Sequence, residues 1–457
     1  MKGMKKIQTA TGSEKNVISL FSGAMGLDLG LRSAGFDTRS VLEVNKAAVD
    51  TIRLNASHLT ELSEEAILHT SVSDITAGEI LKAAGLRREE VTLMSAGPCC
   101  QSFSTAGKRG SMSDPRGGLF FEFCRILQEV RPRFFVMENV RGVLSAAVKH
   151  RTLNERGPGH KPLAQEETFG SALKLILQEL KSLDYYVTFG ILNSADFGVP
   201  QKRWRVFFIG SRDGEEISLP KPTHAAPEQA SELGLEPWVT LRQTIEHVES
   251  SRWNPFAESR LKLLKKLGPG ENWRDLPERL HRDALGAALD SWGGRSGFCR
   301  RLAWDEPAPT LTTAPDGRAT TLCHPTEDRP LSLEEYAVLQ QFPSWWKFSG
   351  SISQQYTQIG NAVPLGFGEA IGKSLLATME RTRLEGLPTD HRQRAGKIVC
   401  ADKVVEKAVR NKKKTQLHPP HLRKNSDLAA AKKWLLTAGT EPGKAKAPRK
   451  STATRSR

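Results

Sequence analysis

The stretch VISLFSGAMGLDLG, residues 17–30, decides the fold expected of this chain. An apolar run rich in β-branched residues, VISLF (17–21), leads into a turn that contains Gly23 and Gly26, and an amphipathic segment follows. A buried strand that passes through a glycine turn into a helix is the first unit of a doubly wound α/β sheet. We therefore expect a mostly parallel sheet that begins at residue 17.

The alternation of strands and helices continues to about residue 210. Further apolar and β-branched runs predict strands at 38–44, 91–96, 133–138, 185–192 and 204–210. Helical periodicity predicts helices between them, near residues 27–34, 46–56, 76–85, 117–130 and 168–183. This pattern predicts an α/β fold of the doubly wound, Rossmann-like type.

Composition divides the chain into three parts. Residues 14–210 carry the alternating pattern and predict the main domain. Residues 211–350 are rich in Pro, Trp, Arg and Gly, which predicts a smaller irregular domain with connecting segments. Helical patterning returns near residues 332–377, and residues 351–380 are expected to complete the main domain. Residues 381–457 predict a basic, mostly disordered tail.

The positive charge of the chain is confined to that tail. The formal net charge is +15, and residues 381–457 hold 21 Lys and Arg against 6 Asp and Glu, so the first 380 residues are formally neutral. Such a tail is typical of a solubilising segment and equally of non-specific attraction to nucleic-acid phosphates. The absence of a long apolar run or signal-peptide pattern predicts a soluble, cytoplasmic protein. Six cysteines without zinc-type spacing predict neither a disulfide framework nor a metal site.

A carboxylate and a glycine turn indicate a nucleotide-type cofactor. Glu43 ends the second predicted strand, 22 residues after Phe21, where a carboxylate suits ribose hydroxyls. The G-x-G-x-x-G spacing of dinucleotide sites is absent, which favours S-adenosylmethionine over NAD. A tight turn without a ligand is the alternative interpretation.

Reactive side chains follow two other predicted strands. Cys100 lies in GPCCQSFS (97–104), where a thiol can act as a nucleophile if nearby amides or cations stabilise its thiolate. Inert packing is the alternative for a single cysteine. Glu138 ends the next strand, and Arg203 and Arg205 stand at alternate positions, on one face of the last strand. A salt-bridged strand edge would explain these arginines equally well.

Ten sequence blocks occur in the order found in a known family. Over about residues 17–377 the chain resembles the DNA cytosine-5 methyltransferase family, of the prokaryotic restriction-modification type. The blocks are FSGAMG, Glu43, Asp74-Ile75, GPCCQSFS, DPRGGLFFEF, ENV, FGVPQKRWR, PAPTLTT, RPLSLEEYAVLQQFP and YTQIGNAVP.

The resemblance implies methyl transfer from S-adenosylmethionine to carbon 5 of a specific cytosine in double-stranded DNA. It makes 14–210, completed by 351–380, the methyltransferase domain and 211–350 the target-recognition domain. A monomer that is functionally paired with a restriction endonuclease is expected. No metal is required by this chemistry.

The resemblance also implies a role for each candidate residue. Cys100 adds to carbon 6 of a cytosine flipped out of the duplex, Glu138 acts at ring nitrogen 3, and Asn139 orders the loop. Arg203 and Arg205 are expected to contact the base, Glu138 or the target phosphate. The implied cofactor contacts are Phe21, Ser22, Gly23, Ala24, Gly26, Glu43, Val44, Asp74, Ile75, Pro98, Asn361 and Val363. The DNA contacts expected from a loop that closes over the base and from the irregular domain are Gln101, Ser104, Lys108, Arg109, Arg274, Arg295, Arg300 and Arg301.

Four positions depart from the family's pattern. Ser19 stands where an acidic residue is usual, Met25 interrupts a glycine pair, and Val44 stands where a tryptophan is usual. Cys99 replaces a proline beside the nucleophile, and the register of the residues that follow selects Cys100 as the reactive thiol.

Three other functions fit parts of the pattern. A transfer-RNA cytosine-5 methyltransferase would use the same pocket, but such enzymes have a shorter recognition region than the roughly 95 residues between Gly210 and the PAPTLTT block. A catalytically inactive DNA-binding regulator would lack Cys100 or Glu138, and both are present. A nicotinamide oxidoreductase is disfavoured by the glycine spacing.

Overall fold

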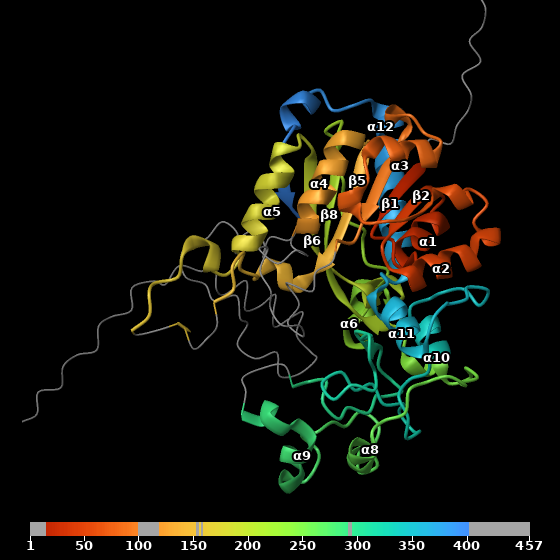
Figure 1. The fold of residues 1–457 in the computed structure, drawn as a ribbon, viewed down its shortest axis with the longest axis vertical. Helices are drawn as coiled ribbons and strands as arrows, with labels where there is room; N and C mark the ends of the chain where they lie inside the picture. Colours follow the sequence, from red (N-terminus) through yellow and green to blue (C-terminus); the bar gives the residue numbers. More distant parts are fainter. Residues whose placement is uncertain (1–14, 99–117, 152–154, 157–158, 291–294, 402–457) are drawn as a thin grey trace, which may run out of the picture. The chain divides into compact units, whose positions relative to one another are not determined.

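A computed structural model describes residues 15–98, 118–151, 155–156, 159–290 and 295–401. At its centre lies an eight-stranded sheet of order β12-β6-β8-β5-β4-β1-β2-β3 (Figure 1). Its strands are β1 (Asn16–Leu20), β2 (Asp37–Glu43), β3 (Ile67–His69), β4 (Leu93–Ala96), β5 (Phe134–Val140), β6 (Tyr186–Asn193), β8 (Trp204–Ser211) and β12 (Ile398–Cys400).

Every pair of neighbouring strands in this sheet is parallel except the two pairs that include β8. β8 runs antiparallel to β5 and to β6. β1 pairs with β2 on one side and with β4 on the other, so the direction of winding reverses between β1 and β4. Loops diverge at such a switch point and form a ligand crevice beyond the carboxyl ends of the strands. The doubly wound α/β fold is therefore confirmed, and its switch point lies between β1 and β4.

Helices cover both faces of the sheet, and the alternation along β5 separates the two faces. Phe134 and Val136 join the apolar core beneath α1 and α12, whereas Phe135 contacts Phe123 of α4 with ring centroids 5.9 Å apart. Figure 1 shows α3, α4 and α5 along one face of the sheet. The bounds of these helices and of α2, α10 and α11 are α1 (Gly26–Ser33), α2 (Lys46–Leu54), α3 (Ala77–Ala84), α4 (Gly118–Val130), α5 (Ser171–Ser182), α10 (Leu333–Leu339), α11 (Ile352–Asn361) and α12 (Leu365–Glu385).

Glycines bring the returning segment against α1. A Cβ on Gly30 would lie 2.2 Å from the carbonyl oxygen of Leu365, and one on Gly26 would lie 2.3 Å from that of Val363. Both distances are far shorter than van der Waals contact, so any side chain larger than hydrogen would push α12 away from α1. Residues 351–380 therefore pack on the main domain, which is discontinuous in sequence.

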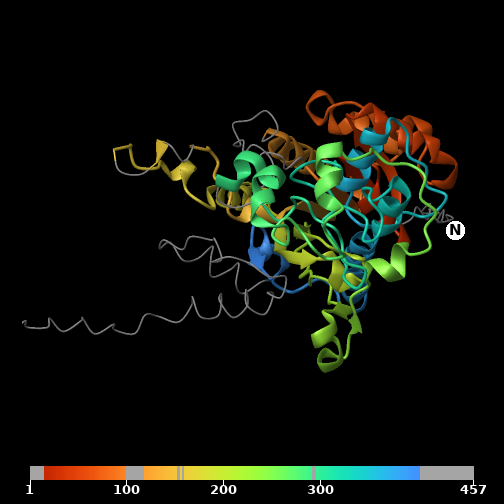
Figure 2. The same cartoon turned by 90° about the horizontal axis from the view of Figure 1, so that it is seen from below.

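Residues 211–350 contain only short elements. A small apolar core that includes Leu264 and Trp273 joins α8 and α9. α11 lies beside α2 (Figure 2). Thr51 Oγ1 of α2 donates a hydrogen bond of 2.6 Å to Gln358 Oε1 of α11. The remaining elements are β7 (Gln201–Lys202), β9 (His224–Ala225), α6 (Pro227–Leu233), β10 (Glu236–Pro237), α7 (Leu241–Ile245), α8 (Glu258–Leu264), α9 (His281–Leu285) and β11 (Ala308–Pro309).

The predicted start of the tail, residue 381, is wrong. α12 continues to Glu385, and β12 pairs in parallel with β6, with Ile398 opposite Val187. The compact unit reaches Ala401, and residues 402–457 lie outside the described part of the chain. The sequence did not reveal β12 because three apolar residues within a basic stretch become a strand only through their pairing with β6.

The described residues contain neither a membrane-spanning helix nor a cluster of metal ligands. No helix there combines the length and the apolar character that a membrane crossing requires. No group of three or more His, Cys, Asp or Glu side chains there is arranged to hold a metal ion.

Candidate active site

The ends of β4 and β5 bring Glu138 next to Gly97. Glu138 lies near the end of β5 and is 8% exposed. Its Oε2 is 3.7 Å from the position that a Cβ on Gly97 would occupy. Gly97 and Pro98 directly follow β4, whereas Cys99 and Cys100 lie outside the described residues. The carboxylate therefore lies beside the residues from which the cysteine-bearing segment departs.

Arg205 holds this carboxylate in place. Its Nε lies 2.6 Å from Glu138 Oε1, and both side chains are 11% exposed. Arg205 is paired with Val140 across β8 and β5, and its Nη1 donates to the carbonyl oxygen of Trp204 at 2.9 Å. Asn139 is buried beside this pair, and its Oδ1 accepts a hydrogen bond of 2.9 Å from the backbone N–H of Val140. Because separating a buried ion pair leaves an uncompensated charge, Glu138 is restricted to one orientation.

Arg203 contacts a different part of the molecule. It is buried in the break between β7 and β8, and its terminal nitrogens donate to the carbonyl oxygens of Gly360 at 3.0 Å and Asn361 at 3.1 Å. These carbonyls lie at the C-terminal end of α11. The prediction that Arg203 and Arg205 share one strand face is wrong because β7 pairs with β11 instead of joining the main sheet. Arg203 connects the sheet edge to the returning segment.

Glu43 fixes the glycine turn that follows β1. It ends β2, as predicted, and its two carboxylate oxygens accept hydrogen bonds from the backbone N–H groups of Gly23 (2.8 Å) and Asn45 (2.7 Å). Phe21 and Gly23 both have positive φ angles, 57° and 53°. A Cβ on Gly23 would point into open space, so a ligand can approach the backbone closely at this turn.

Two other predicted cofactor contacts are exposed near the same edge of the sheet. Val44 directly follows Glu43 and is 65% exposed. Asp74 is also exposed and ends the short 3-10 helix η3 (Val72–Asp74), which follows β3, the neighbour of β2. An apolar surface beside two carboxylates provides the chemistry that a purine with its ribose requires.

The remaining predicted cofactor contacts are engaged in packing or local hydrogen bonds. Ser22 Oγ donates to Ser19 Oγ at 2.9 Å, and the carbonyl oxygen of Ile75 accepts a hydrogen bond of 3.1 Å from Arg125. The side chain of Asn361 is exposed, while its carbonyl oxygen is bound by Arg203. Four more are buried or lie in the contact between α1 and α12: Ala24, Gly26, Pro98 and Val363.

The predicted DNA contacts fall in different environments. Arg274 is exposed and stacks over the ring of Trp273, 4.6 Å from its centroid. The carbonyl oxygen of Arg295 accepts a hydrogen bond of 3.0 Å from Trp273 Nε1, which ties Arg295 to the small core. Four others lie outside the described residues: Gln101, Ser104, Lys108 and Arg109.

Arg300 and Arg301 are adjacent in sequence but differ in their partners. Arg301 is 4% exposed, and its terminal nitrogens donate to three backbone carbonyls and to the carboxylate of Asp328, at 2.6 to 3.1 Å. Arg300 is half-buried, forms no ion pair with a described residue, and has no acceptor there for its buried Nε. Burial lowers the pKa of Arg300 to about 10. Arg301 therefore holds the segment together, and its role as a DNA contact stays a prediction.

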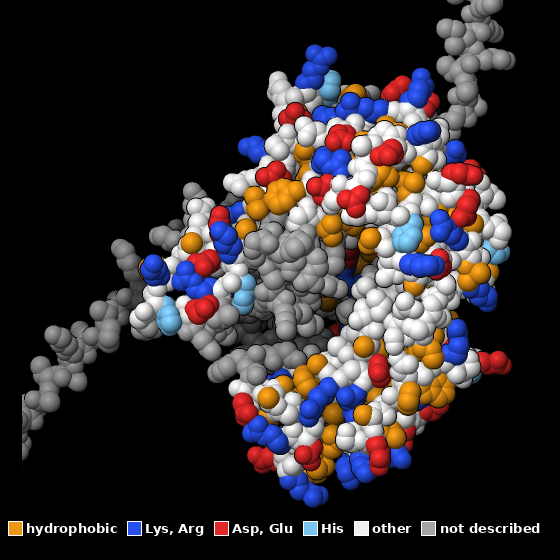
Figure 3. All heavy atoms as spheres, in the orientation of Figure 1, with side chains coloured by type: hydrophobic (Ala, Val, Ile, Leu, Met, Phe, Trp, Pro, Cys, Tyr) orange, Lys and Arg blue, Asp and Glu red, His pale blue; other side chains and the backbone are white. Residues whose placement is uncertain are grey.

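Charges of both signs cover the segment that carries α8 and α9. Figure 3 shows Lys and Arg side chains interspersed with Asp and Glu over this part of the surface. Ion pairs between neighbours account for part of this mixture, among them Arg282–Asp290 at 2.6 Å and Lys262–Glu258 at 2.9 Å. The abundance of arginine in this stretch therefore does not by itself mark a DNA-binding face.

Sequence reasoning missed Asp28. It lies on α1 and is 2% exposed, and its Oδ1 accepts a hydrogen bond of 2.9 Å from Ser95 Oγ. Burial raises the pKa of Asp28 to about 6, although hydrogen bonds from Ser19 and Ser95 act in the opposite direction. The available signal was an acidic residue within the apolar helix GLDLGL (26–31).

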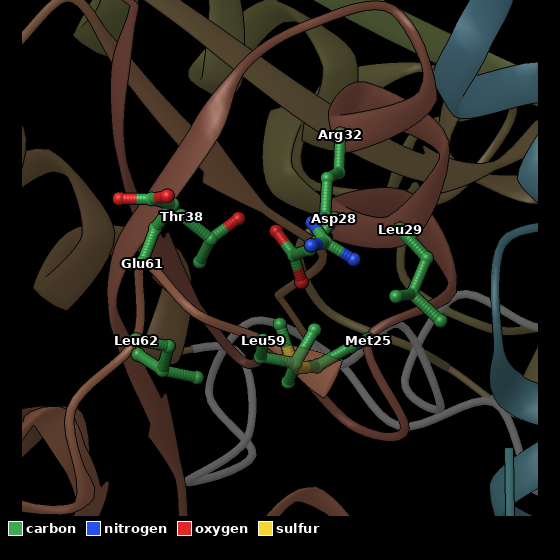
Figure 4. A pocket seen from close by; sticks show the side chains of 8 residues that line it. All are labelled: Met25, Asp28, Leu29, Arg32, Thr38, Leu59, Glu61 and Leu62. Carbon is green, nitrogen blue, oxygen red and sulfur yellow. The ribbon is translucent and has the colours of Figure 1, made fainter. Parts of the chain in front are cut away.

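The cavity beside Asp28 is too small for a cofactor. Figure 4 shows the Asp28 carboxylate, the Arg32 guanidinium and the Thr38 hydroxyl turned toward one another, with leucine side chains around them. The cavity volume is about 10 Å³, which is near the lower limit for one water molecule. The cavity beside Asp28 therefore cannot hold a cofactor of nucleoside size.

The sequence of this chain is similar to that of a known family and of several curated proteins. The sequence model of the family described as C-5 cytosine-specific DNA methylase matches residues 15–377. Type II methyltransferase M.Sau96I from Staphylococcus aureus is 36% identical over 361 residues, which cover 79% of this chain and 75% of that protein. Type II methyltransferase M.Eco47II from Escherichia coli is 32% identical over 377 residues, which cover 80% of this chain and 79% of that protein.

One solved structure has a similar fold. It is described as a DNA modification methyltransferase encoded within an Escherichia coli prophage. The TM-score is 0.53 at 22% sequence identity, and the match covers 80% of this chain and 99% of the other.

Proposed function

The chain belongs to the C-5 cytosine-specific DNA methylase family, and from this premise we propose that it methylates carbon 5 of a specific cytosine in double-stranded DNA. The observation that carries this proposal is the position of Glu138. Its carboxylate is fixed by Arg205 and lies beside Gly97 at the carboxyl end of the neighbouring strand. Cys100 is the third residue after Gly97, and three residues of extended chain span at most about 11 Å. A thiol and a carboxylate can therefore act on the same base.

The two groups have complementary tasks. Carbon 5 of cytosine is a weak nucleophile, so the thiolate of Cys100 first forms a bond to carbon 6 and makes carbon 5 electron-rich. Glu138 binds ring nitrogen 3 and stabilises the charge that develops on the ring. After methyl transfer, a solvent base takes the proton from carbon 5, and the electron pair of that C–H bond forms the double bond between carbons 5 and 6 again. The bond between carbon 6 and sulfur breaks at the same time and releases the Cys100 thiolate. Arg205 keeps Glu138 in position throughout this sequence.

The glycine turn supplies the site for the methyl donor. S-adenosylmethionine provides an activated methyl group when it is bound. Glu43 is positioned to accept hydrogen bonds from ribose hydroxyls, because each of its oxygens retains a free acceptor direction besides its contact with Gly23 or Asn45. Val44 offers an apolar surface for the purine, and Asp74 an acceptor for its amino group.

DNA recognition is assigned to residues 211–350. The cytosine must leave the stacked duplex to reach Glu138, which costs a few kcal/mol and requires phosphate contacts that hold the opened strand. Arg300 is our candidate for one such contact, because no described residue neutralises its guanidinium. We further propose that the protein acts as a monomer and that a restriction endonuclease cleaves the same site when it is unmethylated.

Bisulfite sequencing tests the proposal directly. DNA from cells that express the protein should contain one cytosine within a recurrent sequence that resists conversion, while cells that express a Cys100→Ser variant should show complete conversion. Complete conversion with the unaltered protein would contradict the proposal. Protection confined to transfer RNA would instead favour the RNA-modifying alternative.

A further inference from the structure

A buried hydrogen-bond cluster joins the two strands at the switch point of the sheet. Ser19 on β1 and Ser95 on β4 are direct partners in the parallel register. Asp28 reaches both from α1: Ser95 Oγ donates to Asp28 Oδ1 at 2.9 Å, and Ser19 forms a second side-chain hydrogen bond to the carboxylate. All three side chains are nearly inaccessible to solvent. One carboxylate therefore connects the two strands between which the winding direction reverses.

The cluster extends into the glycine turn. Ser22 Oγ lies 2.9 Å from Ser19 Oγ and 3.2 Å from the carbonyl oxygen of Ser19. When the Ser19 hydroxyl donates its proton to Asp28, its oxygen is free to accept from Ser22. On the other strand, Ser95 is followed by Ala96 and then by Gly97, beside Glu138. The cluster thus reaches the methyl-donor site on one side and the base site on the other.

A purely structural role is a poor explanation for this carboxylate. No described residue forms an ion pair with Asp28. The other charged residues that line the cavity beside Asp28 are Arg32 of α1 and Glu61. Glu61 Oε2 forms an ion pair with Arg39 Nη1 at 3.7 Å. An isolated buried carboxylate weakens the fold compared with an apolar residue of similar size. Asp28 is unfavourable for stability, yet it contacts both strands that lead into the site. A functional role is the best explanation for such a residue.

We propose that Asp28 is a positioning residue that sets the glycine turn after β1 and the end of β4 relative to each other. It touches neither substrate nor the reacting atoms. By accepting one hydrogen bond from each strand, it keeps the methyl-donor turn and the start of the cysteine-bearing segment in one relative position. This inference rests on the proposed methyl transfer, but its first consequence, on cofactor affinity, is measurable without catalysis.

Variants of the two serines test separately the contact of Asp28 with β1, made by Ser19, and its contact with β4, made by Ser95. The dissociation constant of S-adenosylhomocysteine is measured by titration calorimetry, and the methyl-transfer rate is measured in a single turnover at saturating cofactor. Ser19→Ala should weaken cofactor binding about tenfold with the rate changed less than twofold, since one hydrogen bond corresponds to about a factor of ten. Ser95→Ala should lower the rate about tenfold and leave the cofactor affinity within a factor of two.

Asp28→Asn should combine both effects without destabilising the protein. We expect about tenfold weaker cofactor binding and an about tenfold slower single turnover, with an unchanged or higher Tm at pH 8 because a buried charge is removed. Asp50→Asn makes the same chemical change on α2, where Asp50 pairs with Lys46 at 2.6 Å, and serves as the control that leaves both quantities unchanged.

Two results would overturn the inference. One is an Asp28→Asn protein whose cofactor affinity and single-turnover rate both stay within twofold of those of the unaltered protein. The other is a set of losses that follow the fall in Tm across all the variants, as a simple packing role predicts. Failure of the unaltered protein to methylate DNA would refute the proposed function instead, and the calorimetric comparison of cofactor binding would still decide the role of Asp28.

Discussion

The main sheet and the irregular segment 211–350 use charged side chains in opposite ways. In the sheet, strand ladders satisfy the backbone, so Glu138 and Arg205 can be buried as a pair at a strand end. In the segment, strands have two residues each and side chains replace the ladders. Arg301 alone binds three backbone carbonyls.

This difference explains which charged residues are available for function. Where backbone hydrogen bonds are already made, a polar side chain is free to serve chemistry. Where backbone hydrogen bonds are not made within a ladder, arginine side chains bind the loops together instead. Arg318 donates to the carbonyl oxygens of Asp283 and Ala284. Arg329 donates to the carboxylates of Glu327 and Glu335. A functional arginine in the segment is therefore expected to be one that lacks a partner within the protein.

The largest effect expected at the sheet edge is the loss of the nucleophile. Cys100→Ser should reduce turnover by about 10³-fold or more, since a serine hydroxyl is a far weaker nucleophile toward carbon 6 than a thiolate. It should also abolish covalent capture by DNA that contains 5-fluorocytosine, measured by gel shift under denaturing conditions. Cys99→Ser is the matched control and should retain both properties. The reverse pattern would reassign the nucleophile to Cys99.

Glu138→Gln should produce the next largest loss at the same edge. An amide keeps the size of the side chain but cannot supply the charge-assisted contact to ring nitrogen 3, so the methyl-transfer rate should fall by about 10²–10⁴-fold. Calorimetry should show unchanged binding of S-adenosylhomocysteine. A rate within tenfold of the original would mean that Glu138 has no part in the chemistry.

In the segment 211–350, Arg301→Met should reduce the stability of the protein rather than its chemistry. The change removes one hydrogen-bond donor from each of three backbone carbonyls and the ion-pair partner of Asp328, and we expect the free energy of unfolding to fall by about 3–5 kcal/mol. Urea titration followed by tryptophan fluorescence measures it. The comparison between the two regions would fail if this variant kept its stability and lost only DNA binding.

The pH dependence of stability tests the buried carboxylate on the sheet side. The pKa of Asp28 rises from its ordinary value of 3.8 to about 6, so the folded protein binds the proton more tightly than the unfolded chain. The destabilisation by the ionised group is full above about pH 6 and disappears toward pH 4, so stability falls as the pH rises through this range. The shift corresponds to about 3 kcal/mol.

Asp28→Asn should remove that pH dependence. We expect the variant to gain up to about 3 kcal/mol over the original at pH 8 and little at pH 4.5, as measured by urea unfolding at both values. Taking the difference between the two proteins cancels the contributions of all other titrating groups. A difference that does not change with pH would show that Asp28 titrates normally.

The smallest effect is expected at Arg300. Arg300→Met should weaken DNA binding by about tenfold. The slope of the logarithm of the affinity against the logarithm of the salt concentration should fall by about 1, which corresponds to one phosphate contact. The free energy of unfolding should stay within about 0.5 kcal/mol of the original. Fluorescence anisotropy at several salt concentrations measures both quantities. Equal affinity at every salt concentration would leave Arg300 without a role at the DNA.

Predictions for the sheet region agreed with the structure more closely than those for the segment. The expected strands at 17–21, 38–44 and 133–138 correspond to β1, β2 and β5 within two residues. Glu43 and Glu138 lie at strand ends as predicted, because the position of a residue along a strand is a local property. Partners of long side chains are not local, which is why the sequence did not reveal the backbone carbonyls that Arg203 and Arg301 bind.

The sequence by itself determined the alternating elements, the identity of the chemical groups at their ends and the family to which those blocks belong. Only the tertiary structure decided which arginine pairs with Glu138, that β12 extends the sheet, and that Asp28 joins β1 to β4. Periodicity reports which face of a local element is buried. The partner of a buried polar group depends on which distant backbone or side chain is brought against it, and this is settled only when the chain is packed.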